Sequence, residues 1–360
     1  MLNLARIINE HVQKLVPYQS ARRIGGHGHT FLNANESPKS ERYLLNSTKL
    51  NRYPECQPEE LLEGYAGYAG TTRDRVLCCR GSDEAIGLIV RTFVGPEEAV
   101  LIAPPTYGMY EVAARTNNVQ VVKARRNEDF SLSFDLLKEA IDHSSVKVKV
   151  VFIDSPANPL GQVFAEAELR ALLEAYPQLL VVVDEAYVEF AGIEEHSRIT
   201  LLPEYDNLII TRTMSKAFAL AGLRLGYALG HPEVLKALLK VIDPYPISEP
   251  VAQIGAQALS STGVSLTKER VQKCVELRER LRGELEKLKC VREVFPSQAN
   301  FLLIRFGDGP AVFKALAERG IIVRSFVDKP GLDNCLRISI GSPEELDETM
   351  RTLTALDGTL

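Results

Sequence analysis

The chain lacks the features that mark membrane, secreted and nucleic-acid-binding proteins. No apolar run approaches the ~20 residues that a membrane-spanning helix needs. The N-terminal segment carries Arg6, Glu10 and Lys14 among its apolar residues, which predicts a short amphipathic helix and not a secretory signal. The net charge of -5 argues against general nucleic-acid binding, which favours basic patches. We therefore expect a cytoplasmic protein that binds neither membrane nor nucleic acid.

Metal, disulfide and nucleotide motifs are also missing from the sequence. The 6 cysteines include no C-x-x-C pair, so free thiols in a reducing cytosol are the simplest interpretation. His27 and His29 have no third ligand nearby in the sequence, which favours solvated histidines over a metal site. The segment Gly25 to Gly28 does not match G-x-G-x-x-G, and no Walker-type loop is present. We expect no metal and neither of the two common nucleotide-binding folds.

Strand-like and helix-like stretches alternate between about residues 75 and 245 of the 360-residue chain. This alternation predicts an α/β fold with a mostly parallel central sheet. The predicted strands are 75–80, 99–103, 119–124, 148–154, 179–184, 207–212 and 223–229, with helical segments such as 165–175 between them.

A second, smaller α+β domain is predicted beyond a proline-rich joint at 243–250. Residues 265–288 predict a long connecting helix, followed by strands at 300–306, 321–324 and 335–340. The predicted organisation is an N-terminal arm at 1–28, a large domain at 29–245 and a small domain at 246–360. Chain reach places an active site in the crevice between the two domains.

Lys216 stands in an unusually apolar stretch of sequence, between Thr213 and Gly226. Burial disfavours the ammonium form of a lysine and makes its amine a nucleophile that can form a Schiff base with a carbonyl compound such as pyridoxal phosphate (PLP). Thr213, Ser215 and Arg224 would then bind the phosphate of the cofactor. The alternative is that Lys216 ends a buried helix and extends its amine to water.

Polar side chains follow two of the predicted strands that precede Lys216. Asp184 ends the run 179–184, where ligands bind in open α/β sheets, and a carboxylate there can pair with a protonated ring nitrogen. Tyr187 and Asn158 are placed to contact a ring oxygen. The alternatives are a helix N-cap for Asp184, core packing for Tyr187 and an ordinary Asn-Pro turn for Asn158.

The segment around Ser82 and Asp83 precedes an apolar helix predicted at 85–94. Free backbone N–H groups at such a helix start, together with a serine hydroxyl, form an anion site that suits a phosphate. The alternative for Ser82 is a simple N-cap. Tyr107 follows another short strand, and the alternative for its side chain is packing within a loop.

These motifs, in this order, resemble the aspartate-aminotransferase superfamily of PLP enzymes, which has fold type I. The order is an Asn-Pro turn, Asp-x-x-Tyr, Ser-Lys, and an arginine eight residues after the lysine. Further segments are similar to the histidinol-phosphate aminotransferases, and the resemblance covers essentially the whole chain. They are 15–26, 32–38, 50–57, 218–224, 244–246 and 336–339.

The resemblance implies cofactor and catalytic roles for the matching residues. Lys216 would form the Schiff base, Asp184 would pair with the pyridinium nitrogen, and Tyr187 and Asn158 would contact the ring oxygen. Tyr107 would stack on the ring. The residues implied around the phosphate are Ser82, Asp83, Thr213, Ser215, Arg224 and, from the neighbouring subunit of a homodimer, Tyr53.

The resemblance also implies a substrate site and a reaction. Tyr18 and Arg324 would bind the distal anion, Arg337 would bind the α-carboxylate of the amino acid, and Asn35 would complete the substrate site. The implied reaction converts imidazole-acetol phosphate and L-glutamate to L-histidinol phosphate and 2-oxoglutarate, in histidine biosynthesis. The alternatives are an aromatic-amino-acid aminotransferase, a phosphothreonine decarboxylase, or a non-catalytic binding protein of the same fold.

The sequence departs from the usual family pattern at the Asn-Pro turn. Where the family usually reads Asn-Asn-Pro-Thr-Gly, this chain has Ala157, Asn158, Pro159, Leu160 and Gly161. The asparagine that would contact the cofactor is retained, but its two polar neighbours are absent. We expect slightly looser turn geometry without loss of activity.

Overall fold

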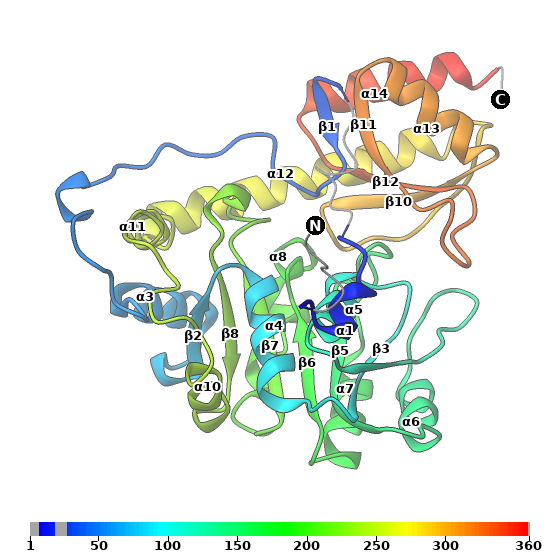
Figure 1. Cartoon of the computed structure of the whole chain (residues 1–360). Coiled ribbons are helices and arrows are strands. Elements are labelled where there is room, and N and C mark those ends of the chain that lie inside the picture. Colours follow the sequence, from blue (N-terminus) through cyan, green and yellow to red (C-terminus); the bar gives the residue numbers. More distant parts are fainter. Residues whose placement is uncertain (1–6, 19–26, 359–360) are drawn as a thin grey trace.

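The computed structural model describes residues 7–18 and 27–358, which form a large and a small domain (Figure 1). The long helix α12 (Ser261–Leu285) extends from the side of the large domain into the small one, as the sequence predicts. The predicted arm at 1–28 and the motif at 15–26 lie partly outside the described residues. No helix among the described residues is long and apolar enough to cross a membrane.

The large domain contains a 7-stranded sheet in the order β2-β8-β7-β6-β5-β3-β4. Only β8 is antiparallel to its neighbours, so the prediction of a mostly parallel sheet is confirmed. All the strands predicted for this domain are present: β2 (Val76–Cys79), β3 (Glu98–Ile102), β4 (Gln120–Lys123), β5 (Lys147–Asp154), β6 (Leu180–Asp184), β7 (Leu208–Thr213) and β8 (Gly226–Gly230).

Helices cover both faces of this sheet because its central strands are apolar on both sides. In β6, Val181 and Val183 pack into one core cluster and Val182 into the other. The helices of the large domain are α3 (Glu59–Ala69), α4 (Ser82–Phe93), α5 (Met109–Thr116), α6 (Phe134–Asp142), α7 (Glu166–Ala175), α8 (Val188–Ala191), α9 (Ile193–His196) and α10 (Pro232–Leu239), with 3-10 turns at Arg73–Arg75, Ile199–Leu201 and Ala221–Leu223.

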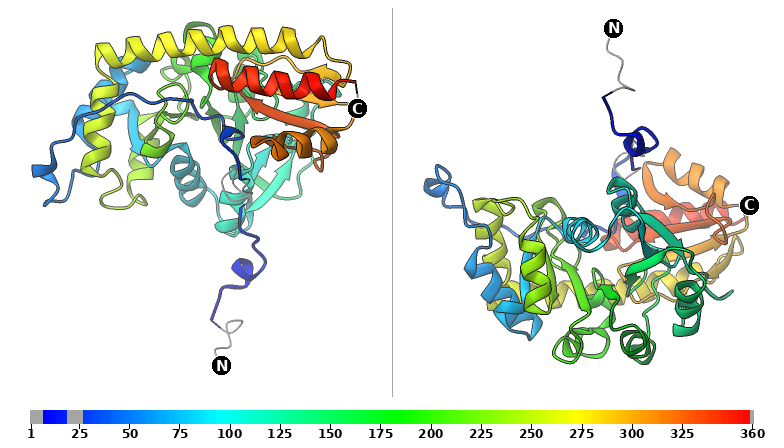
Figure 2. Two further views of the ribbon diagram at one scale, coloured as in Figure 1. Left: turned by 90° about the horizontal axis from the view of Figure 1, so that it is seen from above. Right: turned by 60° about the horizontal axis from the view of Figure 1, so that its bottom comes forward.

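The small domain contains a 5-stranded sheet in the order β1-β11-β12-β10-β9. Its edge strand β1 (Thr30–Leu32) pairs in parallel with β11, so residues 30–32 belong to the small sheet, whereas the sequence predicts a large domain that begins at 29. The remaining strands are β9 (Val291–Val294), β10 (Phe301–Phe306), β11 (Ile321–Ser325) and β12 (Cys335–Ser339). Two helices complete the domain, α13 (Gly309–Glu318) and α14 (Pro343–Leu356), and α14 lies beside α12 (Figure 2).

An extended arm joins β1 to α3 along the outside of the molecule. It holds the 3-10 turn Ser47–Lys49 and is attached to α11 (Glu249–Ala258), where Gln257 and Gln253 accept hydrogen bonds from the backbone N–H groups of Leu44 and Asn46. Several large apolar side chains of the arm are exposed, among them Leu44, Leu45, Leu50 and Tyr53. At the start of the described chain, α1 (Glu10–Gln13) lies against α5.

Candidate active site

Polar side chains gather where β5, β6 and β7 end, on the side that faces the small domain. Asp184 is the last residue of β6 and is 4% exposed. Its carboxylate accepts hydrogen bonds from the Tyr110 hydroxyl (2.8 Å) and the backbone N–H of Ala186 (3.2 Å). Burial raises the pKa of Asp184 to about 7, and the nearby Asp154 carboxylate adds to that rise. The side chain is therefore suited to pair with a cation.

Lys216 lies in the turn after β7, the strand that pairs with β6, which ends at Asp184. Its Nζ donates to the backbone oxygen of Ala34 (2.8 Å) and lies 5.7 Å from the centre of the Tyr187 ring. Burial, with a smaller contribution from the Arg337 guanidinium, lowers the pKa of Lys216 to about 8. The amine is therefore a nucleophile near neutral pH, as predicted from the apolar sequence around it.

The start of α4 and the residues on both sides of Lys216 together form one polar cradle. Arg224, which has a positive φ of 57°, places its guanidinium 3.1 Å from the Asp83 carboxylate and donates to Ser215 Oγ (3.3 Å). Gly81 beside it has a φ of 76°, which L side chains rarely adopt, and a Cβ there would lie 2.7 Å from Arg224 Nη2. Gly81, and not Ser82, is the N-cap of α4, so the alternative role for Ser82 was wrong, and Ser82 is the first helical residue.

The hydroxyl of Tyr187 forms hydrogen bonds with two other predicted site residues. It accepts hydrogen bonds from Asn35 Nδ2 (3.0 Å) and Asn158 Nδ2 (3.3 Å), and burial raises its pKa to about 12. Asn35 is held in a left-handed conformation, with φ 54°, by hydrogen bonds with Ser339 and Asn300 of the small domain. The segment that follows β1, through Asn35, therefore connects the small sheet to the site in the large domain.

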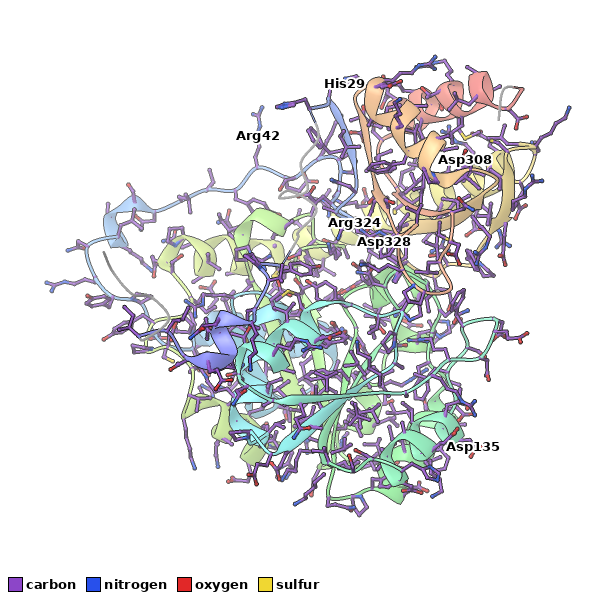
Figure 3. All side chains as sticks on the ribbon, turned by 45° about the vertical axis from the view of Figure 1, so that its right-hand side comes forward. His29, Arg42, Asp135, Asp308, Arg324 and Asp328 are labelled. Atoms are coloured by element: carbon purple, nitrogen blue, oxygen red, sulfur yellow. The ribbon has the colours of Figure 1, made fainter. Side chains whose placement is uncertain are left out.

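Arg337 and Arg324 bring positive charge from the small domain to this site. They are paired residues on β12 and β11, and Figure 3 shows Arg324 on the side of the small domain that faces the large one. Arg337 donates to the backbone oxygen of Asn33 (2.8 Å) and to Asn158 Oδ1. Burial lowers the pKa of Arg337 to about 10, so the guanidinium stays charged at neutral pH.

Two further predicted tyrosines, Tyr107 and Tyr18, lie close to each other. Tyr107 donates its hydroxyl to Asp83 (2.9 Å). A Cβ on the next residue, Gly108, would lie 3.3 Å from the Tyr18 ring, which places Tyr18 beside this loop. The Tyr18 hydroxyl also raises the pKa of Arg337, so the tyrosine lies near the arginine.

This set of side chains fits PLP. The cradle of Ser82, Thr213, Ser215 and Arg224 combines a helix start, hydroxyls and a guanidinium, which are donors for a phosphate. Asp184 is a buried carboxylate whose pKa is raised mainly by burial and also by the nearby Asp154 carboxylate, so it suits a protonated ring nitrogen. Lys216 supplies the amine that the aldehyde requires.

Tyr53 is the one predicted site residue that lies on the exposed arm. Its side chain is 80% exposed and stacks on Tyr245, with ring centres 4.4 Å apart. The structure brings the other predicted residues together, and the role of each remains a prediction. Sequence reasoning missed Tyr110 and Asp154, although Asp154 ends a predicted strand just as Asp184 does, and Tyr110 follows Tyr107 by three residues.

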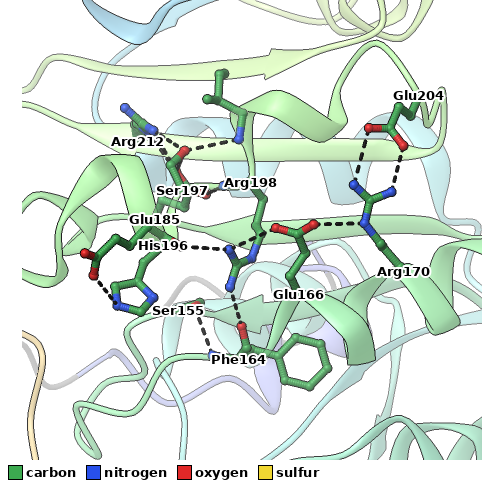
Figure 4. Close-up of polar contacts among 12 residues, drawn as sticks. Ser155, Phe164, Glu166, Arg170, Glu185, His196, Ser197, Arg198, Glu204 and Arg212 are labelled. Atoms are coloured by element: carbon green, nitrogen blue, oxygen red, sulfur yellow. Dashed lines mark hydrogen bonds and ion pairs between the residues drawn. The ribbon is translucent and has the colours of Figure 1, made fainter.

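A buried ionic network lies behind the ends of β6 and β7 (Figure 4). The Arg212 guanidinium is 2.8 Å from the Glu185 carboxylate, and both side chains are fully buried. Glu185 also accepts hydrogen bonds from the Ser197 hydroxyl and the Arg198 backbone, and Arg198 reaches the Phe164 carbonyl. Because Glu185 follows Asp184 and Arg212 precedes Thr213, this network fixes the backbone beneath two site residues.

Comparison with known proteins identifies the family. Residues 26–353 match the model of aminotransferase class I and II. The histidinol-phosphate aminotransferase of Aeromonas hydrophila subsp. hydrophila is 48% identical over 361 residues, which covers 99% of each chain.

Solved structures show the same fold. The histidinol-phosphate aminotransferase from Sinorhizobium meliloti, in complex with pyridoxal-5'-phosphate, is similar with a TM-score of 0.86, 24% identity and 98% coverage of each chain. L-threonine-O-3-phosphate decarboxylase from Porphyromonas gingivalis is similar with a TM-score of 0.77 and 22% identity, over 91% of this chain and 99% of that one. The fold alone therefore does not separate these two activities, whereas the sequence similarity does. The chain belongs to the aminotransferase class I and II family and, within it, to the histidinol-phosphate aminotransferases.

Proposed function

We propose that this protein is the PLP-dependent aminotransferase that converts imidazole-acetol phosphate and L-glutamate to L-histidinol phosphate and 2-oxoglutarate in histidine biosynthesis. The similarity of 48% identity over the full chain supports the choice of substrate. The observation that carries the reaction class is the Lys216 amine, with its lowered pKa, after β7, together with the buried Asp184 carboxylate at the end of the neighbouring strand β6. Bound PLP would supply an electron-withdrawing ring that stabilises negative charge at the α-carbon of the amine substrate.

The residues of the large domain would hold the cofactor and move the proton. Lys216 would hold the aldehyde covalently before substrate arrives, and its released amine would take the proton from the α-carbon. The Asp184 carboxylate would keep the ring nitrogen protonated. Since Tyr110 donates to one oxygen of Asp184 and the Ala186 N–H to the other, the carboxylate is fixed in orientation.

The residues of the small domain would recognise the two different substrates. Arg337 would form a forked pair with the α-carboxylate of glutamate, a group that histidinol phosphate does not have. Arg324, with Tyr18, would bind either the phosphate of histidinol phosphate or the distal carboxylate of glutamate, because a guanidinium binds both anions.

The proposed assembly is a homodimer in which Tyr53 completes the phosphate site of the neighbouring subunit. The exposure of Tyr53, together with Leu44 and Leu50 on the same arm, supports this arrangement, because exposed apolar patches mark association surfaces. All six cysteines are free thiols, which agrees with the proposed cytoplasmic location.

The test is a substrate profile of the purified protein with added PLP. We expect glutamate to form from 2-oxoglutarate when histidinol phosphate is present, and Lys216→Ala to remain folded without turnover. Normal turnover by Lys216→Ala would exclude the assigned role of the lysine. Preference for phenylalanine would favour an aromatic aminotransferase. Release of carbon dioxide from phosphothreonine would favour a decarboxylase, and PLP binding without turnover would favour a binding protein.

A further inference from the structure

We infer that Asp154 is a positioning residue of the cofactor pocket, because its buried carboxylate ties together the two loops that present Tyr107 and Asn158. This inference rests on the proposed function, since it concerns how tightly and in which orientation PLP is held.

One carboxylate oxygen makes both connections. Asp154 is the last residue of β5, is 4% exposed and is paired in register with Asp184 on β6. Its Oδ2 accepts the backbone N–H of Tyr107 (3.2 Å) and the backbone N–H of Asn158 (2.8 Å). The loop that follows β3 and the turn that follows β5 are thereby held at a common point. Hydrogen bonds to an ionised acceptor are stronger than neutral ones.

A buried arginine supplies the opposite charge. Arg126 Nη2 lies 3.7 Å from Asp154 Oδ1, and the arginine side chain is only 6% exposed. The guanidinium is itself fixed, since it donates to the backbone oxygens of Ala103 (2.8 Å) and Phe130 (3.1 Å). Burial raises the pKa of Asp154, and the charge of Arg126 opposes that rise. The arginine therefore favours the ionised carboxylate that the two N–H groups need.

The Asn-Pro turn of this chain depends on that support. Ala157 and Leu160 are buried, and neither side chain can form a hydrogen bond. Pro159 has no N–H. Within the turn, the Gly161 N–H donates to the Ala157 carbonyl, but the N–H of Asn158 is bonded to the Asp154 carboxylate. The carboxylate from the strand end thus supplies a side-chain anchor that Ala157, Pro159 and Leu160 cannot provide.

The same placement has an electrostatic cost. The charge of Asp154 raises the pKa of the neighbouring Asp184, which has to be ionised to pair with a ring nitrogen. A neutral acceptor in place of Asp154 would avoid that repulsion. The positive charge of Arg126, 3.7 Å from Asp154, offsets that repulsion, so Asp154 and Arg126 act as a pair.

The test compares PLP binding by the wild type with binding by Asp154→Ala and Asp154→Asn. Glu168→Gln is the matched control, because the Glu168 carboxylate also accepts a backbone N–H, that of Phe134, and lines the same pocket of about 320 Å³ as Asp154 and Arg126. The measurements are the PLP dissociation constant from visible absorbance, the visible circular dichroism of bound PLP, and the rise in Tm on PLP binding.

We expect Asp154→Ala to weaken PLP binding by about 10- to 100-fold, as for other residues that orient ligand-binding groups. Asp154→Asn keeps an acceptor oxygen and should lose less, while Glu168→Gln should stay within about twofold of the wild type. The dichroism should change in both Asp154 variants, because Tyr107 and Asn158 would no longer fix the ring. Asp154→Asn decides the outcome if Asp154→Ala does not fold.

Unchanged affinity and unchanged dichroism in the Asp154 variants would overturn the inference while leaving the proposed function intact. A wild type that does not bind PLP would instead refute the proposed function. Equal losses in Glu168→Gln and Asp154→Asn would also count against the inference, since they would indicate a general loss of stability.

Discussion

At the scale of single residues, Asn158 links the cofactor side of the site to the substrate side. Its Nδ2 donates to the Tyr187 hydroxyl and its Oδ1 accepts from Arg337. Arg337 in turn lowers the pKa of Lys216. A change at Arg337 therefore acts on substrate binding directly and on the lysine through its charge.

Arg337→Gln should separate the two half-reactions. Only glutamate and 2-oxoglutarate carry an α-carboxylate, so only they lose the forked pair with the guanidinium. We expect kcat/KM for glutamate to fall by about 100-fold, equivalent to about 3 kcal/mol, and kcat/KM for histidinol phosphate to fall far less. Single-turnover kinetics with each substrate alone would measure this. Arg324→Gln is the control, because it should weaken both substrates, and equal losses in Arg337→Gln would contradict the assignment.

The reaction of the protein with PLP should depend on pH through Lys216. Because its pKa is lowered to about 8, the free amine becomes the main form as the pH rises through 8. The rate constant for PLP association with the cofactor-free protein should rise with pH and level off above that value. In Arg337→Gln the midpoint should move to higher pH, since a nearby cation is removed. A wild-type midpoint near the 10.5 of an ordinary lysine would show that the amine is not desolvated.

At the scale of elements, the Glu185–Arg212 pair links the ends of two neighbouring strands. Glu185 directly follows β6, and Arg212 is the second-last residue of β7. Both side chains are fully buried, and removing either partner leaves an unpaired charge in the core. Such a loss costs about 3–5 kcal/mol, whereas replacing both partners by apolar residues of similar size costs much less. The value of the pair therefore depends on both members being present.

Glu185→Leu and Arg212→Met should each lower the free energy of unfolding by about 3–5 kcal/mol, and the double variant should recover most of the loss. Urea unfolding of the cofactor-free protein would measure all three. The exposed pair of Glu233 and Lys236 is the control, and breaking it should change stability by less than about 1 kcal/mol. Additive losses in the double variant would contradict this account.

Elements with a strong local pattern could be predicted, and elements that depend on distant partners could not. The strand predicted at 148–154 contains the continuous apolar run 150–153, and the structure has β5 at Lys147–Asp154. By contrast, β1 has three residues and forms only because β11, near the other end of the chain, lies beside it. The same reason explains why Lys216 and Asp184 could be proposed but the contact of Tyr110 with Asp184 could not. That hydrogen bond depends on how α5 packs against the sheet.

At the scale of the whole molecule, the arm between β1 and α3 is the feature that a single chain does not explain. It is held to α11 by the amides of Gln253 and Gln257, yet it leaves Tyr53 80% exposed, stacked on Tyr245. A two-fold axis near the arm would cover this surface in both subunits at once. Sedimentation should therefore show a dimer, and an active monomer would contradict the proposed assembly.

Mixing two defective variants should show in which subunit Tyr53 acts. Tyr53→Ala should bind PLP weakly and have little activity at limiting PLP, and Lys216→Ala should have none. In a hybrid dimer, the site that retains Lys216 would receive Tyr53 from its partner and be complete. After unfolding and refolding an equal mixture, about half of the dimers would be hybrids with one working site, giving about a quarter of the wild-type activity. If Tyr53 served its own subunit, the mixture would show no more activity than the two variants separately, because no hybrid would contain both residues in one site.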